Sequence, residues 1–305
     1  MRLKILLQMA GNGLLIAAIA HALIGVSLVW DKVLLKRRGT QNLLSYVFWL
    51  GAISVFGLIL IPFGLHFPTI PMAGVGLAAG LLDLVASYFY YSALKAGEAS
   101  EELAAMGGFS PVATALFSIP ILGRSVEGQL LGFTLMTLGG FVMFFAERRP
   151  LKKMAPRILI ASCAFGLSNV LQKLIFNDTG FVTGFVFFSF GTFGGSMAML
   201  IPPSWRRQIF ESSEAAEPKS KFWYMVNRFL AGLGSFLVVY AISRASPAIV
   251  GAAAGVRYVV IFVGAYAITK CKPSWFREEF RGGVLVAKTI ATVLVIAGLI
   301  MAKMN

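Results

Sequence analysis

Long apolar stretches dominate this chain and limit what it can fold into. Each is about 20 residues long, the length that an α-helix needs to cross roughly 30 Å of hydrocarbon in a bilayer. They recur along all 305 residues, of which 58% are hydrophobic and 13% charged. Soluble domains are less apolar and carry about twice that share of charge. We therefore predict an all-helical integral membrane protein with short loops and no soluble domain of ordinary size.

The breaks between the apolar stretches predict ten membrane-spanning helices. Basic or Pro-rich turns separate them, such as residues 36–39 after the first and residues 147–150 after the fifth. The longest polar segment, Pro202–Lys221, is expected to form a mobile surface loop. The predicted spans are Gly11–Trp30, Leu43–Leu65, Ile70–Leu94, Leu103–Leu122, Gln129–Phe145, Ile158–Phe176, Phe181–Ile201, Phe222–Ile242, Ala248–Ile268 and Gly282–Met301.

Two parts of the chain repeat each other. Residues 21–32 align with residues 162–173, and a second match joins residues 91–95 to 240–244. The halves are then residues 1–150 and 151–305, with five spans each. Because five is odd, the second half must enter the membrane from the opposite side, which predicts two inverted five-helix repeats around a central cavity. The alternative is chance similarity between apolar helices. The identical pairs are Gly25 and Gly166, Ser27 and Ser168, Val29 and Val170, and Lys32 and Lys173.

The net charge of +14 has a membrane explanation. Two thirds of the 27 Lys and Arg residues lie in the loops after the first, third, fifth, seventh and ninth spans. The positive-inside rule places those loops in the cytoplasm, so both termini are expected outside it. Because most of the basic residues lie in these loops, the net charge is explained by membrane topology and does not indicate binding to nucleic acid.

Few ionisable side chains lie inside the predicted spans, and each costs about 3 kcal/mol at the bilayer centre. Asp83, His21 and Arg257 fall near the middle of their spans, and Arg228 about a third of the way along its own. Asp83 either binds substrate or protons, or forms a fixed ion pair with Arg228 or Arg257. His21 either titrates near physiological pH or is a neutral imidazole hydrogen-bonded to a neighbouring helix.

The two arginines could bind a carboxylate or a phosphate through paired hydrogen bonds. For Arg228 the alternative is a side chain that snorkels to the membrane interface. Tyr88, Asn169 and Gln172 are further candidates for lining a cavity.

Signatures of catalysis and of metal binding are missing from the sequence. It has two histidines, no Ser-His-Asp set, no phosphate-binding loop and no cluster of metal ligands. Cys163 and Cys271 are expected to be ordinary unpaired thiols. We predict neither an enzyme nor a resident cofactor or metal.

Three segments resemble a known family. They are residues 91–100 (YSALKAGEAS), residues 109–117 (FSPVATALF) and residues 122–132 (LGRSVEGQLLG), and residues 241–247 look like the matching turn in the second half. Together they resemble the EamA-like branch of the drug/metabolite transporter superfamily. The resemblance implies an inverted-repeat bundle with a cavity lined mainly by the first, third, fourth, sixth, eighth and ninth helices, and export or exchange of small metabolites such as amino acids.

The chain departs from that family pattern at two places. Arg124 and Ser125 stand where the family usually has an acidic residue. The loop at residues 63–68 has neither Lys nor Arg, whereas family members more often place basic residues there and the N-terminus inside. The family habit and the charge count therefore disagree on orientation, and we follow the charge count.

These observations predict a secondary transporter that moves small polar metabolites by alternating access across the bacterial cytoplasmic membrane. A monomer should suffice, and protons are a candidate for the coupling ion. The alternative is a flippase or carrier for phosphorylated metabolites or lipid-linked head groups, which would use the two arginines. A third possibility is a non-transporting membrane subunit, which would have no continuous polar cavity at the midplane.

Overall fold

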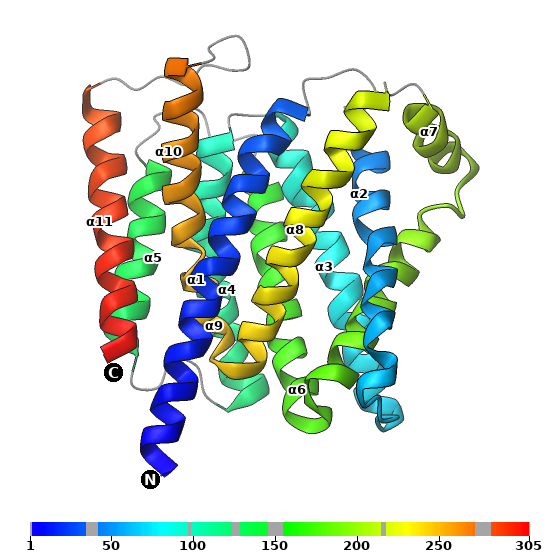
Figure 1. Ribbon diagram of the computed structural model, residues 1–305, viewed down its shortest axis with the longest axis horizontal. Helices are drawn as coiled ribbons and strands as arrows, with labels where there is room; N and C mark the ends of the chain where they lie inside the picture. Colours follow the sequence, from blue (N-terminus) through cyan, green and yellow to red (C-terminus); the bar gives the residue numbers. More distant parts are fainter. Residues whose placement is uncertain are drawn as a thin grey trace.

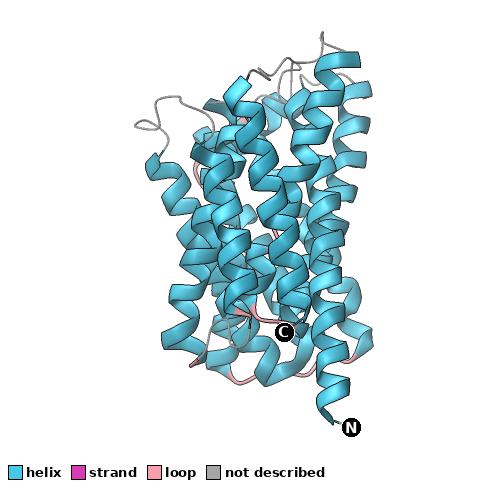
Figure 2. Ribbon diagram, turned by 90° about the vertical axis from the view of Figure 1, so that its left-hand side faces the viewer, coloured by secondary structure: helices cyan, strands magenta, loops and turns pink. Residues whose placement is uncertain are grey.

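The computed structural model describes residues 2–34, 42–96, 99–123, 129–145, 155–214, 218–271 and 282–304. Within these ranges all regular structure is helical and no strand occurs. The helices lie side by side and run roughly along one axis, and α1 begins at the same end of the bundle at which α11 finishes (Figures 1 and 2). They are α1 (Arg2–Leu34), α2 (Leu43–Ile53), η1 (Ser54–Phe63), α3 (Ile70–Ala96), α4 (Ala99–Leu122), α5 (Leu130–Phe145), α6 (Ala155–Ala198), α7 (Pro203–Glu214), α8 (Pro218–Arg244), α9 (Pro247–Ala252), α10 (Gly255–Cys271) and α11 (Gly282–Met304).

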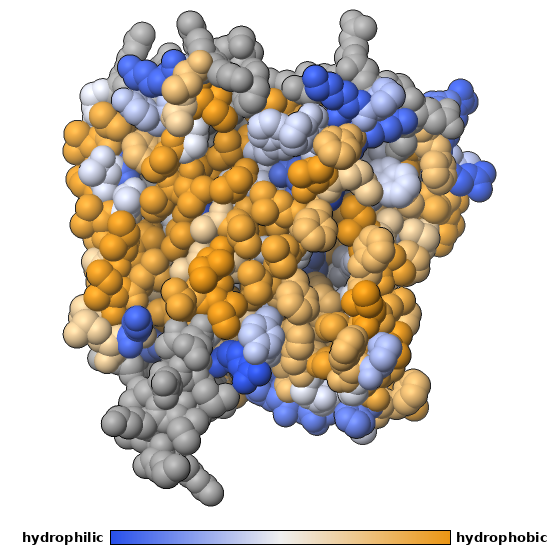
Figure 3. Space-filling model, viewed as in Figure 1, coloured by the Kyte–Doolittle hydropathy of each residue, from blue (hydrophilic) through white to orange (hydrophobic). Residues whose placement is uncertain are grey.

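Seven helical segments of the described chain are long and apolar enough to cross a membrane. Two shorter apolar helices, Gly108–Leu122 and Leu130–Val142, accompany them. The outward faces of these helices expose large apolar side chains, including Phe56, Ile119 and Phe229. Figure 3 shows the result as a broad apolar band with hydrophilic residues gathered towards the two ends. The prediction of an all-helical, multi-pass membrane protein is confirmed.

The candidate span Pro156–Ala198 is 43 residues long, about twice what one crossing needs. It is bent at Gly180, which has φ 78° and ψ 174° inside the otherwise continuous helix α6. That combination is essentially restricted to glycine because any side chain would clash with the backbone. The two spans predicted as Ile158–Phe176 and Phe181–Ile201 lie on either side of this bend.

The polar segment after α6 differs from its prediction. The expected surface loop at Pro202–Lys221 contains a helix, α7, which packs beside α2 outside the main bundle (Figure 1). Its buried residue is Ile209, while Arg207 donates a hydrogen bond of 2.6 Å from Nε to Glu211 on the exposed side. That carboxylate raises the pKa of Arg207 above its ordinary value. One apolar contact face was enough to order a segment whose composition is polar overall.

Helices α3 and α6 approach so closely that small residues are required between them. A Cβ atom on Gly191 would lie 2.1 Å from the backbone oxygen of Leu77, and one on Gly80 would lie 2.0 Å from that of Phe188. Both obstacles are backbone atoms, which cannot rotate away. The packing that holds α3 against α6 therefore depends on these two glycines.

We expect Gly191→Ala to lower the free energy of unfolding by about 1–3 kcal/mol, because the added methyl group overpacks this helix contact. Gly194 is the matched control, since a Cβ there meets nothing within 4 Å. Gly194→Ala should be neutral or stabilising by up to about 1 kcal/mol, the helix-propensity gain of alanine. Denaturant unfolding in detergent micelles measures both, and equal effects would contradict the packing explanation.

Candidate functional site

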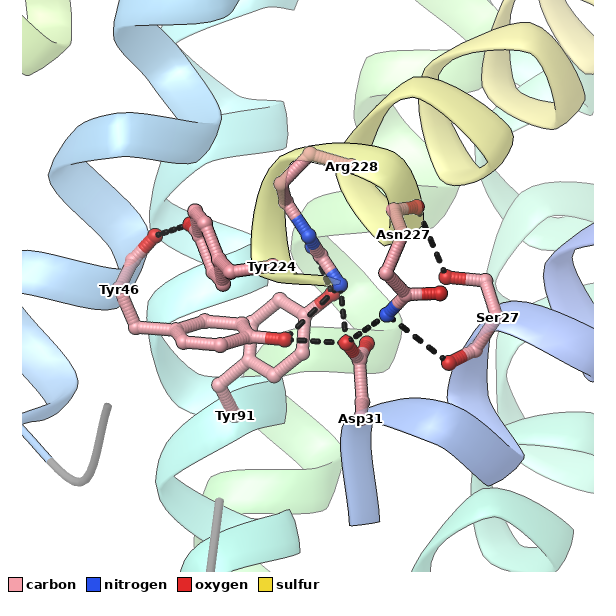
Figure 4. A network of polar contacts seen from close by, with 7 residues as sticks. All are labelled: Ser27, Asp31, Tyr46, Tyr91, Tyr224, Asn227 and Arg228. Atoms are coloured by element: carbon pink, nitrogen blue, oxygen red, sulfur yellow. Dashed lines mark hydrogen bonds and ion pairs between the residues drawn. The ribbon is translucent and has the colours of Figure 1, made fainter. Parts of the chain in front are cut away.

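Seven polar and aromatic residues from four helices form one buried network, here called the Asp31 network (Figure 4). It joins the last turns of α1 to α2, α3 and the first part of α8. Its centre is an ion pair between Asp31, which is fully buried, and Arg228, which is 4% exposed. The members are Ser27, Asp31, Tyr46, Tyr91, Tyr224, Asn227 and Arg228.

The hydrogen bonds that Asp31 accepts from its neighbours in the network all end on one of its two carboxylate oxygens. Arg228 Nη2, Asn227 Nδ2 and the Tyr46 hydroxyl all donate to Oδ1. Asn227 Nδ2 also donates to the backbone oxygen of Ser27 at 3.2 Å, which fixes α8 against α1. The second oxygen, Oδ2, is buried and has no partner in the described part of the chain.

Three tyrosines enclose the Arg228 guanidinium. Its Nη2 donates to the Tyr46 hydroxyl at 2.8 Å, and its Nη1 donates to the Tyr91 hydroxyl at 3.2 Å. The guanidinium carbon lies 4.8 Å from the Tyr46 ring centroid and 5.4 Å from that of Tyr224. Aromatic faces attract a cation, most strongly where water is excluded. The rings thus help to hold the arginine charge inside the bundle.

Asp31 is not among the site residues predicted from the sequence, because the predicted first span ends at Trp30, one residue before it. The repeat offered a signal, since Asp31 aligns with Gln172, which was selected as a candidate. The suggested ion pair between Asp83 and Arg228 is wrong, because Arg228 pairs with Asp31. The expectation that Arg228 could snorkel is also wrong, because its side chain is buried, paired with Asp31 and surrounded by tyrosines.

His21 and Arg257 form a second polar contact, between α1 and the start of α10. Arg257 Nη2 lies 3.0 Å from His21 Nδ1, and His21 Nε2 lies 2.9 Å from the backbone oxygen of Val250. A guanidinium can only donate and a carbonyl oxygen can only accept. His21 must therefore be neutral in this arrangement, with its proton on Nε2, which is the second of the two states that the sequence left open.

A break between α9 and α10 makes this contact available. The Ala254 N–H donates to Gly251 O at 3.1 Å instead of to Val250 O, as a regular α-helix would require. This tightened turn frees the Val250 carbonyl to accept from His21. Arg257 follows directly in the first turn of α10, so the same irregularity positions both residues.

Asp83 stands apart from both contacts. It is half-buried on α3 and makes no hydrogen bond or ion pair with any described residue. It lies one turn from Ala79, whose backbone oxygen accepts a hydrogen bond of 2.8 Å from Ser168 on α6. Asp83 is thus an acid within an apolar helix whose charge no described group neutralises.

The remaining predicted residues lie on α3 and α6. Gln172 is buried, and its Nε2 lies 3.1 Å from Ser168 Oγ, while its Oε1 has no partner in the described structure. Asn169 and Tyr88 are half-buried and make no hydrogen bond with the described residues. The structure therefore brings Arg228 together with Asp31 and His21 together with Arg257, but does not unite all seven candidates in one cluster.

A hollow opens in the face of the molecule shown in Figure 3. It lies at mid-height between α8 and the lower part of α2, in front of α3, and hydrophilic residues are visible inside it. Above it the two helices touch, because the Tyr224 hydroxyl of α8 donates to the Tyr46 backbone oxygen of α2 at 3.3 Å. The Asp31 network therefore closes the bundle above a more open polar region.

Metal ligands and thiols offer no further site in the described ranges. No three His, Cys, Asp or Glu side chains there come together as possible metal ligands. Cys163 and Cys271 are both free, as the sequence predicted. The site in the described ranges consists of charged and hydrogen-bonding groups, which are able to bind a polar solute.

Comparison with known proteins gives a family match and a fold match. Residues 11–146 match the family described as the EamA-like transporter family. No curated protein matches the chain. A protein of solved crystal structure aligns over 96% of this chain and 96% of its own, with a TM-score of 0.61 and 15% sequence identity. At that identity the similarity concerns the fold alone.

Proposed function

Because residues 11–146 of this chain match the EamA-like transporter family, a branch of the drug/metabolite transporter superfamily, we propose that the protein is a secondary transporter of small polar metabolites. The observation that carries the proposal is the set of charged groups enclosed between apolar helices: the Asp31–Arg228 pair, Arg257 and Asp83. Ionisable residues inside a membrane protein typically mark a solute or ion pathway. The solute would bind among these groups, and the helices would move around it.

Ten crossings in two inverted halves, residues 1–150 and 151–305, are part of the proposal. The bend at Gly180 supports counting α6 as two crossings, and an even number of crossings agrees with α1 beginning at the end at which α11 finishes. Repeat-related glycines also make equivalent contacts. Gly25 of α1 packs on Val260 of α10, and Gly166 of α6 packs on Ala113 of α4.

The Asp31 network would act as the closed gate of one conformation. It joins α1 of the first half to α8 of the second, near the end at which α1 finishes and α8 begins (Figures 1 and 4). At the equivalent place in the other half, the uncharged Gln172 replaces Asp31 and donates to Ser168 one turn earlier in α6, while the neighbouring Lys173 donates to the backbone oxygen of Ser243 on α8 at 3.1 Å. One end of the pathway would thus be held by an ion pair and the other by weaker contacts. By the charge count the ion-paired end faces the cytoplasm.

Metabolites with a fixed charge are the favoured solutes, because Arg257 keeps a charge that no described residue neutralises. A carrier or flippase for phosphorylated compounds was expected to use both arginines. Arg228 is already neutralised by Asp31, so that alternative has one arginine left. The hollow in Figure 3 also supports transport over a subunit that lacks a polar cavity.

Transport is tested in two steps. Purified protein is first screened for thermal stabilisation by amino acids, sugar phosphates and lipid phosphates. The most stabilising solute is then offered, radiolabelled, to proteoliposomes with and without a pH gradient. We expect uptake well above that of protein-free liposomes, and faster exchange when unlabelled solute is preloaded. A failure of every screened solute to enter faster than in protein-free liposomes would count against a transporter of this class.

A further inference from the structure

Arg257 carries a positive charge inside the bundle that no described acid neutralises. The buried acid Asp31 is committed to Arg228. The contact of Arg257 with another side chain is the 3.0 Å hydrogen bond from Nη2 to His21 Nδ1, and that imidazole is neutral. An arginine stays protonated in proteins. Its charge at this depth therefore calls for a counterion from outside the described chain.

Two buried hydrogen-bonding groups near Arg257 are unsatisfied. The Arg257 Nε atom is buried and has no acceptor among the described residues. The hydroxyl of Tyr90, a residue 6% exposed on α3, also has no partner there. Tyr90 is close enough to Arg257 for the two to interact electrostatically. Arg257 Nε can only donate and a tyrosine hydroxyl can also donate, so each can serve an acceptor with negative charge.

The backbone at the start of α10 does not provide the site. The N–H groups of Val256 and Arg257 already donate to Ala253 O and Ala254 O, at 3.0 and 2.9 Å. Binding must therefore rely on side chains. His21 contributes by holding one side of the guanidinium, because its own proton is directed to the Val250 carbonyl. The remaining N–H groups of Arg257 are left for a ligand.

We propose that Arg257, assisted by Tyr90, binds the anionic group of the transported solute, a carboxylate or a phosphate. Arg228 does not take this role, since its terminal nitrogens already donate to Asp31, Tyr46 and Tyr91. The inference rests on the proposed transport function and names its substrate class. A paired hydrogen bond from a guanidinium to an oxyanion is both strong and directional.

The test is anion binding to the purified full-length protein, in a buffer whose counterions are bulky organic ones. Sodium acetate and sodium phosphate are the soluble probes, each at 0 to about 20 mM, and micelles with phosphatidic acid form a separate arm for a lipid phosphate. At a dissociation constant near 1 mM, wild type should gain about 3 °C in melting temperature from a bound probe. Arg257→Gln should weaken binding about 10- to 100-fold, the loss of a charge-assisted hydrogen bond, and Arg257→Lys should weaken it less.

The control is Arg244→Gln, which removes an exposed arginine at the end of α8 and should leave the anion effect unchanged. If Arg257→Gln does not fold, wild type is treated with phenylglyoxal, and phosphate should protect Arg257 from modification as measured by mass spectrometry. The proposal is overturned if neither soluble anion nor the lipid raises the melting temperature, if Arg257→Gln responds like wild type, or if phosphate gives no protection. Uptake that persists without any anion effect would remove this site and leave the transport function standing.

Discussion

Asp31→Asn is expected to lower the free energy of unfolding by about 3–5 kcal/mol, the cost of leaving one partner of a buried ion pair without the other. The amide keeps the shape of the side chain but removes the charge that balances Arg228. The guanidinium would then stay buried among Tyr46, Tyr91 and Tyr224, whose hydroxyls are neutral. Chemical unfolding of the purified protein in detergent micelles measures the loss.

A double-variant cycle measures how much Asp31 and Arg228 stabilise the bundle as a pair, apart from the effect of changing each side chain by itself. Replacing Asp31 by Asn and Arg228 by Gln together should cost less than the sum of the two single losses, by at least about 2 kcal/mol. Glu211→Gln, in the exposed ion pair on α7, is the control and should have no measurable effect. Additive losses in the cycle would show that Asp31 and Arg228 do not stabilise the bundle as a pair.

Asp83→Asn is expected to abolish accumulation driven by a pH gradient. One pH unit corresponds to about 1.36 kcal/mol per proton, so a gradient of two units could concentrate a solute about 100-fold if one proton moves with it. Asp83 is the candidate for that proton, because no described residue neutralises it. The variant should bring solute only to equal concentrations on both sides, in the same proteoliposomes as above.

Exchange in the absence of a gradient distinguishes coupling from folding. Because Asp83 has no partner to lose among the described residues, the asparagine variant should keep its melting temperature and its exchange of labelled for unlabelled solute. Asp178→Asn removes an exposed acid near the bend of α6 and should behave as wild type. Undiminished accumulation by the Asp83 variant would remove this residue from the coupling step.

The sequence predicted the helices and the family well, because both depend on long runs of residues. Apolar length located the helices that the structure shows, and the motif around residues 91–132 indicated the family that residues 11–146 match. Polar segments with one apolar face were harder. The helix α7 was predicted as loop because its stability comes from docking on α2, which composition does not reveal.

The candidate site was predicted in part. Arg228, Arg257 and His21 were found because charge is unexpected within an apolar span. Asp31 was missed because a charge near the end of a span is normally exposed to water, and its burial depends on contacts with α2 and α8. Tyr88, the tyrosine predicted to line a cavity, makes no hydrogen bond in the described structure, whereas the hydroxyl of Tyr91 accepts one from Arg228. Which residues pair was decided by helix packing.

Distances between spin labels at the two ends of the bundle test the central proposal most directly, namely that two halves rock around an enclosed charged site. After Cys163 and Cys271 are replaced by serine, one label pair is placed at the exposed residues Trp49 and Phe222, which flank the Asp31 network. A second pair is placed at Phe63 and Arg244 towards the opposite end.

The double replacement of Asp31 by Asn and Arg228 by Gln, which removes the gate without leaving a buried charge, is then introduced into both labelled proteins. Alternating access predicts that the first distance lengthens while the second shortens. Two distances that stay fixed, or that change in the same direction, would contradict the account.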